Sequence, residues 1–113
     1  MLHTVVETVP YLADAERLFS AEEQATIVDT VSADPRCGVV MPGTGGVRKL
    51  RVAVSGRGKR GGARIIYLFG GDNVPVFLLA GFAKNEKSDL SQAERNYLAR
   101  MTAELIRSYR SGR

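Results

Sequence analysis

The ten residues from 74 to 83 (VPVFLLAGFA) are almost wholly apolar and constrain the fold more than any other segment. The turn-forming sequence Gly70-Gly71-Asp72-Asn73 precedes them. This pattern predicts the second strand of a hairpin, buried on both of its faces. The run is far shorter than the roughly 20 apolar residues that a helix needs to cross a bilayer. The rest of the chain must therefore supply the neighbouring strands and the elements that pack on both faces of this strand.

Three more strands and three helices are predicted around it. Residues 47–54 and 63–69 alternate as half-buried strands do, and residues 2–8 form a weaker first strand that Pro10 ends. Helices are predicted over residues 11–19, from Ser20 to Ala33, and from Ser91 onwards; the last two begin with the S-x-x-E spacing of a capping box. Strands cluster in the centre and helices at the ends. The fold class is α+β: an antiparallel β-sheet meander with two N-terminal helices and one C-terminal helix, in a single domain over residues 1–113.

The excess positive charge is concentrated in one stretch. The chain has 16 basic and 12 acidic side chains, and seven of the basic ones, with no acid, lie between Val47 and Ile65. Without these seven, the remaining chain would be acidic. Four glycines lie in the same stretch, and Gly45 and Gly46 directly precede it; glycines allow close approach of the backbone to a ligand. Basic side chains bind phosphate, so RNA or DNA is the first expected ligand.

Several other classes of protein are excluded by composition. The N-terminus lacks the charged and apolar regions of a signal peptide, which favours the cytoplasm. The one cysteine, Cys37, cannot form an intramolecular disulfide, and one Cys with one His cannot make the usual zinc site. No metal and no cofactor are expected. The string Gly56-x-Gly58-x-x-Gly61 precedes a strand rather than a helix, so it does not predict a dinucleotide site.

Strand alternation and hairpin arithmetic predict where the basic residues converge. Lys49 and Arg51 are expected on one strand face, opposite the core-facing Leu50, and Arg64 begins the next strand. In a hairpin centred at residues 72–73, positions whose numbers add to about 146–148 lie opposite each other. This arithmetic predicts that Arg64 and Lys84 are cross-strand neighbours. Such a cluster suits metal-free phosphodiester cleavage, in which arginine stabilises developing charge and a lysine or Glu86 transfers protons.

Two stretches resemble a known family. PGTGGVRKLRVAVSGRGKRGGARIIYLF (42–69) and FLLAGFAKNEKSDLS (77–91) are similar to the RelE/HigB-like toxins of bacterial type II toxin–antitoxin systems. The resemblance covers about residues 40–105 and is to the HigB-like subgroup. It implies a small α+β toxin that cleaves mRNA in the ribosomal A site without a metal. Its implied partners are the ribosome, mRNA and a cognate antitoxin, expected to be a helix-turn-helix DNA-binding protein, with no membrane involved.

The resemblance also implies roles for individual residues. Arg64 and Lys84 would form the catalytic pair, with Lys59 and Glu86 as further members of the catalytic set. Glu86 has an equally weighted structural interpretation, in which it simply pairs with Lys84 or Lys87. The remaining basic side chains would bind RNA: Arg48, Lys49, Arg51, Arg57, Arg60 and Lys87.

Two alternatives to a ribosome-dependent nuclease stay open at this point. One is a non-catalytic module that binds RNA or the ribosome. The other is a ParE-like toxin, which acts on DNA gyrase. Many RelE relatives place a Tyr or His after the last strand, whereas residues 84–89 here contain no aromatic side chain. Tyr67 is the only substitute, and its place in a strand favours a core position.

Overall fold

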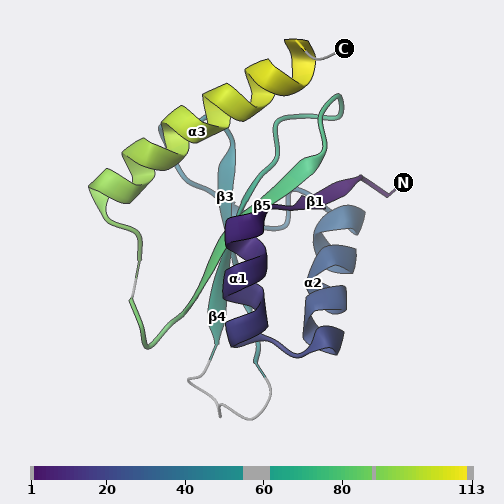
Figure 1. Cartoon of the computed structure of the whole chain (residues 1–113), viewed down its shortest axis with the longest axis vertical. Coiled ribbons are helices and arrows are strands. Elements are labelled where there is room, and N and C mark those ends of the chain that lie inside the picture. The colour runs from purple at the N-terminus through teal and green to yellow at the C-terminus, as the bar shows by residue number, and fades with distance from the viewer. Residues whose placement is uncertain (1, 55–61, 88, 112–113) are drawn as a thin grey trace.

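The computed structural model describes residues 2–54, 62–87 and 89–111. These residues form a five-stranded sheet, and Figure 1 shows helices on both of its faces. The strands have the spatial order β1-β5-β4-β3-β2. No helix in the described ranges is long and apolar enough to cross a membrane. In chain order the elements are β1 (Val5–Glu7), α1 (Val9–Leu18), α2 (Ala21–Ala33), β2 (Val39–Val40), β3 (Val47–Val52), β4 (Ala63–Leu68), β5 (Val76–Ala83) and α3 (Gln92–Ser111).

The sheet differs from the predicted meander in two respects. Strands β2 to β5 pair antiparallel with their neighbours, but β1 lies parallel to β5. The sheet is therefore mixed, because α1 and α2 carry the chain away from β1 before the meander begins. The extra strand β2 lies where no strand was predicted, and its two exposed valines, Val39 and Val40, pair with Lys49 and Arg48. Two residues are too few to show an alternating pattern.

Two apolar cores hold the helices to opposite faces of the sheet. Tyr11 of α1 and Val31 of α2 pack against Ile65 and Leu78 on one face. Leu98 of α3 packs against Ile66 and other sheet residues on the other face. Strand β5 contributes to both cores, which confirms the prediction of a strand buried on both sides. The molecule thus has three layers, with α3 crossing the sheet alone (Figure 1).

The helix starts follow the predicted capping signals. Ser20 caps α2, with its hydroxyl accepting from Glu23 N and the Glu23 carboxylate accepting from Ser20 N. Ser91 and Glu94 make the same two hydrogen bonds at the start of α3. The prediction that Pro10 ends the first strand was wrong: the strand stops at Glu7, and Pro10 lies in the first turn of α1. The first helical turn accepts proline because its N–H groups have no partner within the helix.

The predicted pairing of Arg64 with Lys84 was also wrong. Arg64 lies opposite Phe82, and Lys84 follows the end of β5, where its N–H donates to Gly62 O at 3.0 Å. The turn is centred at residues 72–73 as predicted, but this centre makes opposite positions add to 145, and an irregularity between Ile66 and Tyr67 raises the sum only to 146. Arg64 and Lys84 add to 148, so they cannot be opposite each other. A shift of two residues preserves the face of the sheet. Arg64 therefore stays on the predicted face but gains a different neighbour.

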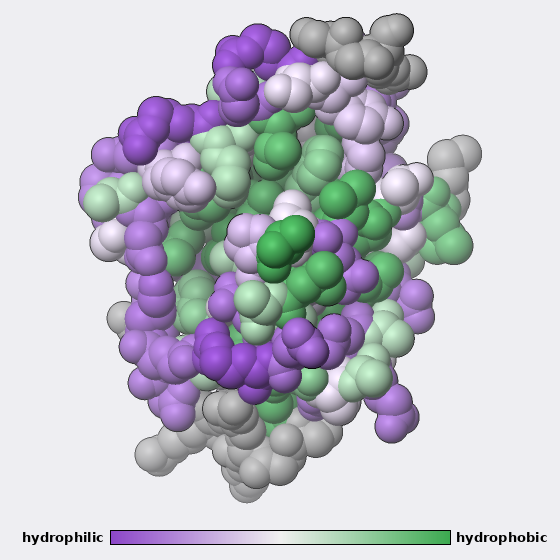
Figure 2. Space-filling view, viewed as in Figure 1, coloured by the Kyte–Doolittle hydropathy of each residue, from purple (hydrophilic) through white to green (hydrophobic). Residues whose placement is uncertain are grey.

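Helix α3 leaves an apolar groove between itself and the sheet. This helix packs on the sheet through Leu98, Met101, Leu105 and Ile106, which recur at helical spacing. Tyr97 and Tyr109 lie outside this core and are 58% and 40% exposed. A groove of about 580 Å³ runs beside the helix, and Figure 2 shows apolar side chains gathered in the hollow below α3. Its lining includes Pro10, Ile66, Leu79, Leu90, Tyr97 and Met101.

Candidate functional site

The candidate site lies on the sheet face that α3 crosses, where β3 and β4 run side by side. Lys49 and Arg51 belong to this face, because they alternate along β3 with residues such as Leu50 that pack in the opposite core. Arg64 of β4 stands directly opposite Arg51 in the register. Strand alternation therefore predicted the face of all three cations. We call the following residues the basic face: Lys49, Arg51, Arg64, Lys84 and Lys87.

Arg51 and Arg64 form a like-charged pair across two strands. Arg64 is only 8% exposed, and its guanidinium donates to Ala63 O at 3.3 Å, whereas Arg51 is exposed. Across the described ranges, no carboxylate forms an ion pair with either arginine. Like charges directly opposite each other destabilise a sheet, and arginine keeps its charge even when buried. A phosphate bound between the two side chains would relieve this repulsion.

Asp89 links the basic face to α3. Its carboxylate accepts from Lys49 Nζ at 3.0 Å and from an Arg95 guanidinium nitrogen at 3.1 Å. The backbone N–H of Leu90 and the Lys49 ammonium hold the pKa of Asp89 below its usual value. Sequence analysis missed Arg95, because the spacing of residues along the last helix does not show that Asp89 contacts both Arg95 and Lys49.

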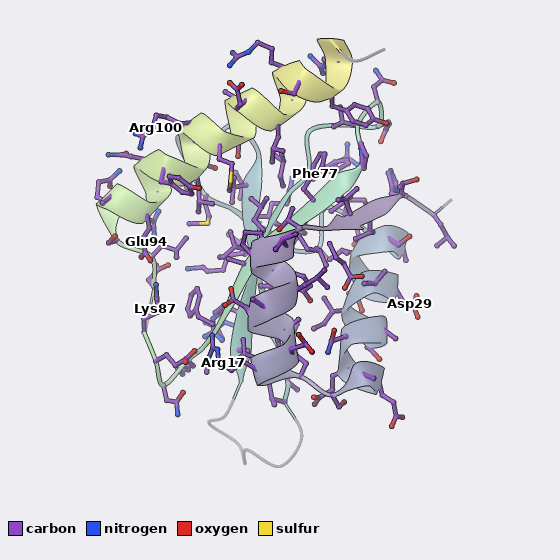
Figure 3. All side chains as sticks on the ribbon, in the orientation of Figure 1. Arg17, Asp29, Phe77, Lys87, Glu94 and Arg100 are labelled. Carbon is purple, nitrogen blue, oxygen red and sulfur yellow. The ribbon has the colours of Figure 1, made fainter. Side chains whose placement is uncertain are left out.

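Lys87 is held by a second acid and an aromatic ring. Its ammonium lies 2.5 Å from a Glu94 carboxylate oxygen and 5.5 Å from the centre of the Phe82 ring. The hydrogen bond from Lys87 and the backbone N–H of Ser91 lower the pKa of Glu94. Figure 3 shows Lys87 on the segment that joins β5 to α3, and Glu94 at the start of α3. Two lysines of the basic face thus hold carboxylates in the free protein.

Glu86 points towards α1 rather than towards Arg64. One of its carboxylate oxygens accepts from Ala83 N at 2.9 Å, and the other lies 2.5 Å from Arg17 Nη1. The cation in these contacts is Arg17 of α1, which lies 69 positions earlier in the chain, and not Lys84 or Lys87 as predicted.

Arg48 and Tyr67 lie on the opposite face of the sheet from the basic face. Arg48 donates from Nη1 to the carbonyl oxygens of Arg36 and Gly38, at 3.2 and 2.8 Å. The Tyr67 hydroxyl donates to Pro35 O and accepts from Gly38 N, and burial raises the pKa of this phenol well above its usual value. Both side chains therefore hold the segment between α2 and β2 in place. The structure shows this structural role of Arg48, and its predicted contact with RNA stays a prediction.

The PGTGG sequence (42–46) forms a tight turn that serves β3. The Thr44 hydroxyl donates to Met41 O at 2.6 Å and accepts from Val47 N at 3.2 Å. Gly46 has φ 118°, and a Cβ atom there would lie 2.9 Å from Phe69 O. Only glycine suits this conformation and this close approach, so the motif has a structural reason.

The other members of the predicted site lie outside the described residues. Arg57, Lys59 and Arg60 belong to the predicted basic loop between β3 and β4, and their roles stay predictions. In the remaining parts of the chain, no group of three or more His, Cys, Asp or Glu side chains is arranged to hold a metal ion.

The fold and the site define a class: small α+β proteins whose sheet presents arginines and lysines on one face beneath a C-terminal helix. The family model of the RelE toxin of the RelE/RelB toxin–antitoxin system matches residues 23–111 of the chain. The chain belongs to this family of toxins, which confirms the RelE-type prediction, whereas the HigB-like subgroup stays a prediction.

A solved structure shows the same fold. It is a free-state mutant of E. coli toxin RelE in which two arginines are replaced by alanine. The similarity has a TM-score of 0.57 at 18% sequence identity, and it covers 78% of this chain and 90% of that one. At this identity the similarity shows the fold alone.

Proposed function

We propose that this toxin is a ribosome-dependent endoribonuclease that cleaves mRNA in the A site. The observation that carries the proposal is the Arg51–Arg64 pair, in which two cations face each other across strands and, among the described residues, no acid forms an ion pair with either. Holding such a pair costs stability, which is understandable if a substrate phosphate completes it. Family membership supports the same activity.

The proposed reaction is attack of an RNA 2′-hydroxyl on its own phosphate. A bond forms between the 2′-oxygen and phosphorus, the bond from phosphorus to the 5′-oxygen breaks, and a cyclic phosphate and a 5′-hydroxyl result. Arg64 and Arg51 stabilise the negative charge that develops on the phosphate oxygens. Lys84 and Lys59 transfer protons, and Lys49 and Lys87 bind flanking phosphates.

Mapping of mRNA 5′ ends tests this proposal. The wild-type toxin, expressed from a tight promoter, should cut a reporter mRNA only when that mRNA is translated, and a reporter without a start codon should stay intact. The double variant Arg64→Ala plus Lys84→Ala should not cut. Equal cutting by this variant would refute the assigned site. Ribosome co-sedimentation without cleavage would indicate a binding module, and DNA breaks with intact mRNA would indicate a gyrase poison.

An antitoxin is the partner that family membership implies, and we propose a helix-turn-helix protein with an acidic or amphipathic segment. Acidic side chains would neutralise the basic face, and apolar ones would fit the groove beside α3, where Tyr97 is exposed. Co-purification from the native host should recover a small DNA-binding protein. Its release from the toxin by high salt would assign the contact to charge rather than to the groove.

Replacing Asp89 by asparagine should strengthen binding of single-stranded RNA. The change frees Lys49 from its carboxylate partner, so one more phosphate contact becomes available. The slope of log K against log salt should steepen by roughly 0.7, measured with 2′-methoxy RNA that cannot be cleaved. Glu104→Gln is the matched control, because it removes an acid that pairs with Arg107 on exposed α3. An equal change in both variants would show that net charge alone is responsible.

Asp89 also predicts a pH dependence of stability. Because the Leu90 N–H and then Lys49 lower its pKa in the folded protein, these contacts of the ionised carboxylate stabilise the fold above the ordinary pKa of aspartate. This contribution is lost as the pH falls through the lowered folded-state value. The wild type and Asp89→Asn should therefore differ in melting temperature at neutral pH and converge in acid. A constant difference at every pH would contradict the ion-pair assignment.

A further inference from the structure

The edge of β5 that faces β1 is only partly covered by that strand, and side chains bind the backbone groups that β1 does not reach. Strand β1 pairs only with Val76, Phe77 and Leu78, although β5 continues to Ala83. The Thr8 hydroxyl donates to Leu78 O at 2.7 Å. Further along, Gly81 N donates to Asp14 at 3.0 Å, and Ala83 N donates to Glu86 at 2.9 Å. Side-chain oxygens therefore satisfy backbone groups that a longer β1 would have paired.

Arg17 joins the two carboxylates at this edge. One of its guanidinium nitrogens lies 3.4 Å from Asp14 Oδ1, and the other lies 2.5 Å from Glu86 Oε2. Each carboxylate thus accepts from a backbone N–H of β5 with one oxygen and pairs with Arg17 through the other. The guanidinium fork suits this bridging position, which a lysine ammonium would fill less well. Figure 3 shows Arg17 projecting from α1 towards the segment that follows β5.

The bridge fixes the turn that carries Lys84. Glu86 N donates back to Ala83 O at 2.9 Å, so the turn is closed by the backbone and the side chain of Glu86. On its other side, Lys84 N donates to Gly62 O, just before the strand of Arg64. The backbone of Lys84 is therefore held between α1 and β4. The Arg17–Glu86 contact ties this turn to the helix.

We propose that Arg17 is a positioning residue, which acts through Glu86 to hold Lys84 beside Arg64. This inference rests on the proposed nuclease function. It also gives Glu86 a role in positioning instead of proton transfer, because one of its oxygens pairs with Arg17 of α1 and the other accepts from Ala83 N of β5. A positioning residue should change the rate of the chemical step without changing how tightly the toxin binds ribosomes.

Single-turnover cleavage on programmed ribosomes tests the role of Arg17. Arg17→Ala should slow cleavage by about tenfold to a hundredfold, with an unchanged dissociation constant for ribosomes. Arg17→Lys should restore part of the rate. Arg107→Ala is the matched control, since it removes another exposed arginine that pairs with an acid three residues away, and it should cleave normally. Because the Arg17 pair is exposed, the variant should fold and melt like the wild type.

Two further measurements separate this inference from the proposed function. Glu86→Gln keeps an acceptor for Ala83 N but loses the charge, so Arg17→Ala should add little to its effect on the rate. Hydrogen exchange at the Ala83 amide should accelerate in Arg17→Ala. A wild type that does not cleave would refute the nuclease proposal, whereas unchanged exchange would refute the positioning. Active wild type with equal cleavage by Arg17→Ala would overturn the inference while leaving the nuclease intact.

Discussion

Replacing Arg64 by methionine should abolish mRNA cleavage and at the same time stabilise the protein. Loss of one group that stabilises transition-state charge typically costs 10²- to 10³-fold in rate, so we expect a fall of about this size. Stability should rise because the buried cation faces Arg51 without an acid partner, and methionine fills a similar space without charge. The measurements are single-turnover cleavage and urea denaturation of the same preparations.

This combination distinguishes a functional arginine from a structural one. Arg48→Met is the matched control. Arg48 is also a strand arginine, in β3, but it lies on the opposite face of the sheet and donates to the carbonyls of Arg36 and Gly38. It should lower stability and leave cleavage by folded protein unchanged. Arg64→Lys should retain intermediate activity, since it keeps the charge but loses the fork of donors. A destabilised Arg64→Met that still cleaves would show that Arg64 belongs to the scaffold.

Local periodicity predicted the faces of the sheet but not the partners across it. Alternation of period two depends only on neighbouring residues, so it placed Lys49, Arg51 and Arg64 on one face correctly. Register depends on turn geometry, and the irregularity between Ile66 and Tyr67 has no marker in the sequence. The pairing of Arg64 with Lys84 failed for another reason: it requires a turn centred at residue 74, whereas the pairs beside the turn are centred at residues 72–73.

Contacts between residues far apart in the chain could not be predicted from the sequence, for a different reason. Glu86 pairs with Arg17, which lies 69 residues earlier, and Lys49 pairs with Asp89, which lies 40 residues later. These pairs form only when the chain folds, because folding places α1 near the end of β5 and the segment before α3 near β3. The strand at residues 5–7 was predicted, but its parallel pairing with β5 was not, because nothing in these residues specifies the direction of a neighbour. Capping boxes at Ser20 and Ser91 were predictable since they act within one helical turn.

Tyr67→Phe should destabilise the protein without harming the chemistry. The Tyr67 side chain is fully buried, and its hydroxyl donates to Pro35 O at 2.8 Å and accepts from Gly38 N at 2.7 Å. Removing it leaves a buried carbonyl and a buried N–H without partners, at about 1–3 kcal/mol each. We expect the free energy of unfolding to fall by about 2–4 kcal/mol, measured by urea denaturation. Tyr97→Phe, at an exposed position on α3, is the control and should have no effect.

The same variant decides whether Tyr67 substitutes for the aromatic group of other RelE relatives. Its phenol is neutral, because burial raises the pKa, and both of its hydrogen-bonding roles are taken by the segment before β2. It also lies on the sheet face opposite Arg64. Cleavage per folded molecule should therefore match the wild type below the lowered melting temperature. A loss of cleavage in folded Tyr67→Phe would place the phenol in the reaction after all.

Arg48 and Tyr67 should also be energetically coupled, because both hold the backbone between residues 35 and 38. Arg48 donates to Gly38 O, and Tyr67 accepts from Gly38 N, so both side chains bind the backbone of the same residue. Once either contact is lost, the segment can move to water and the other contact weakens. The double variant Arg48→Met plus Tyr67→Phe should therefore cost less than the sum of the single changes, by about 0.5–3 kcal/mol in a double-mutant cycle. Strict additivity would mean that the segment stays in place with only one of its two anchors.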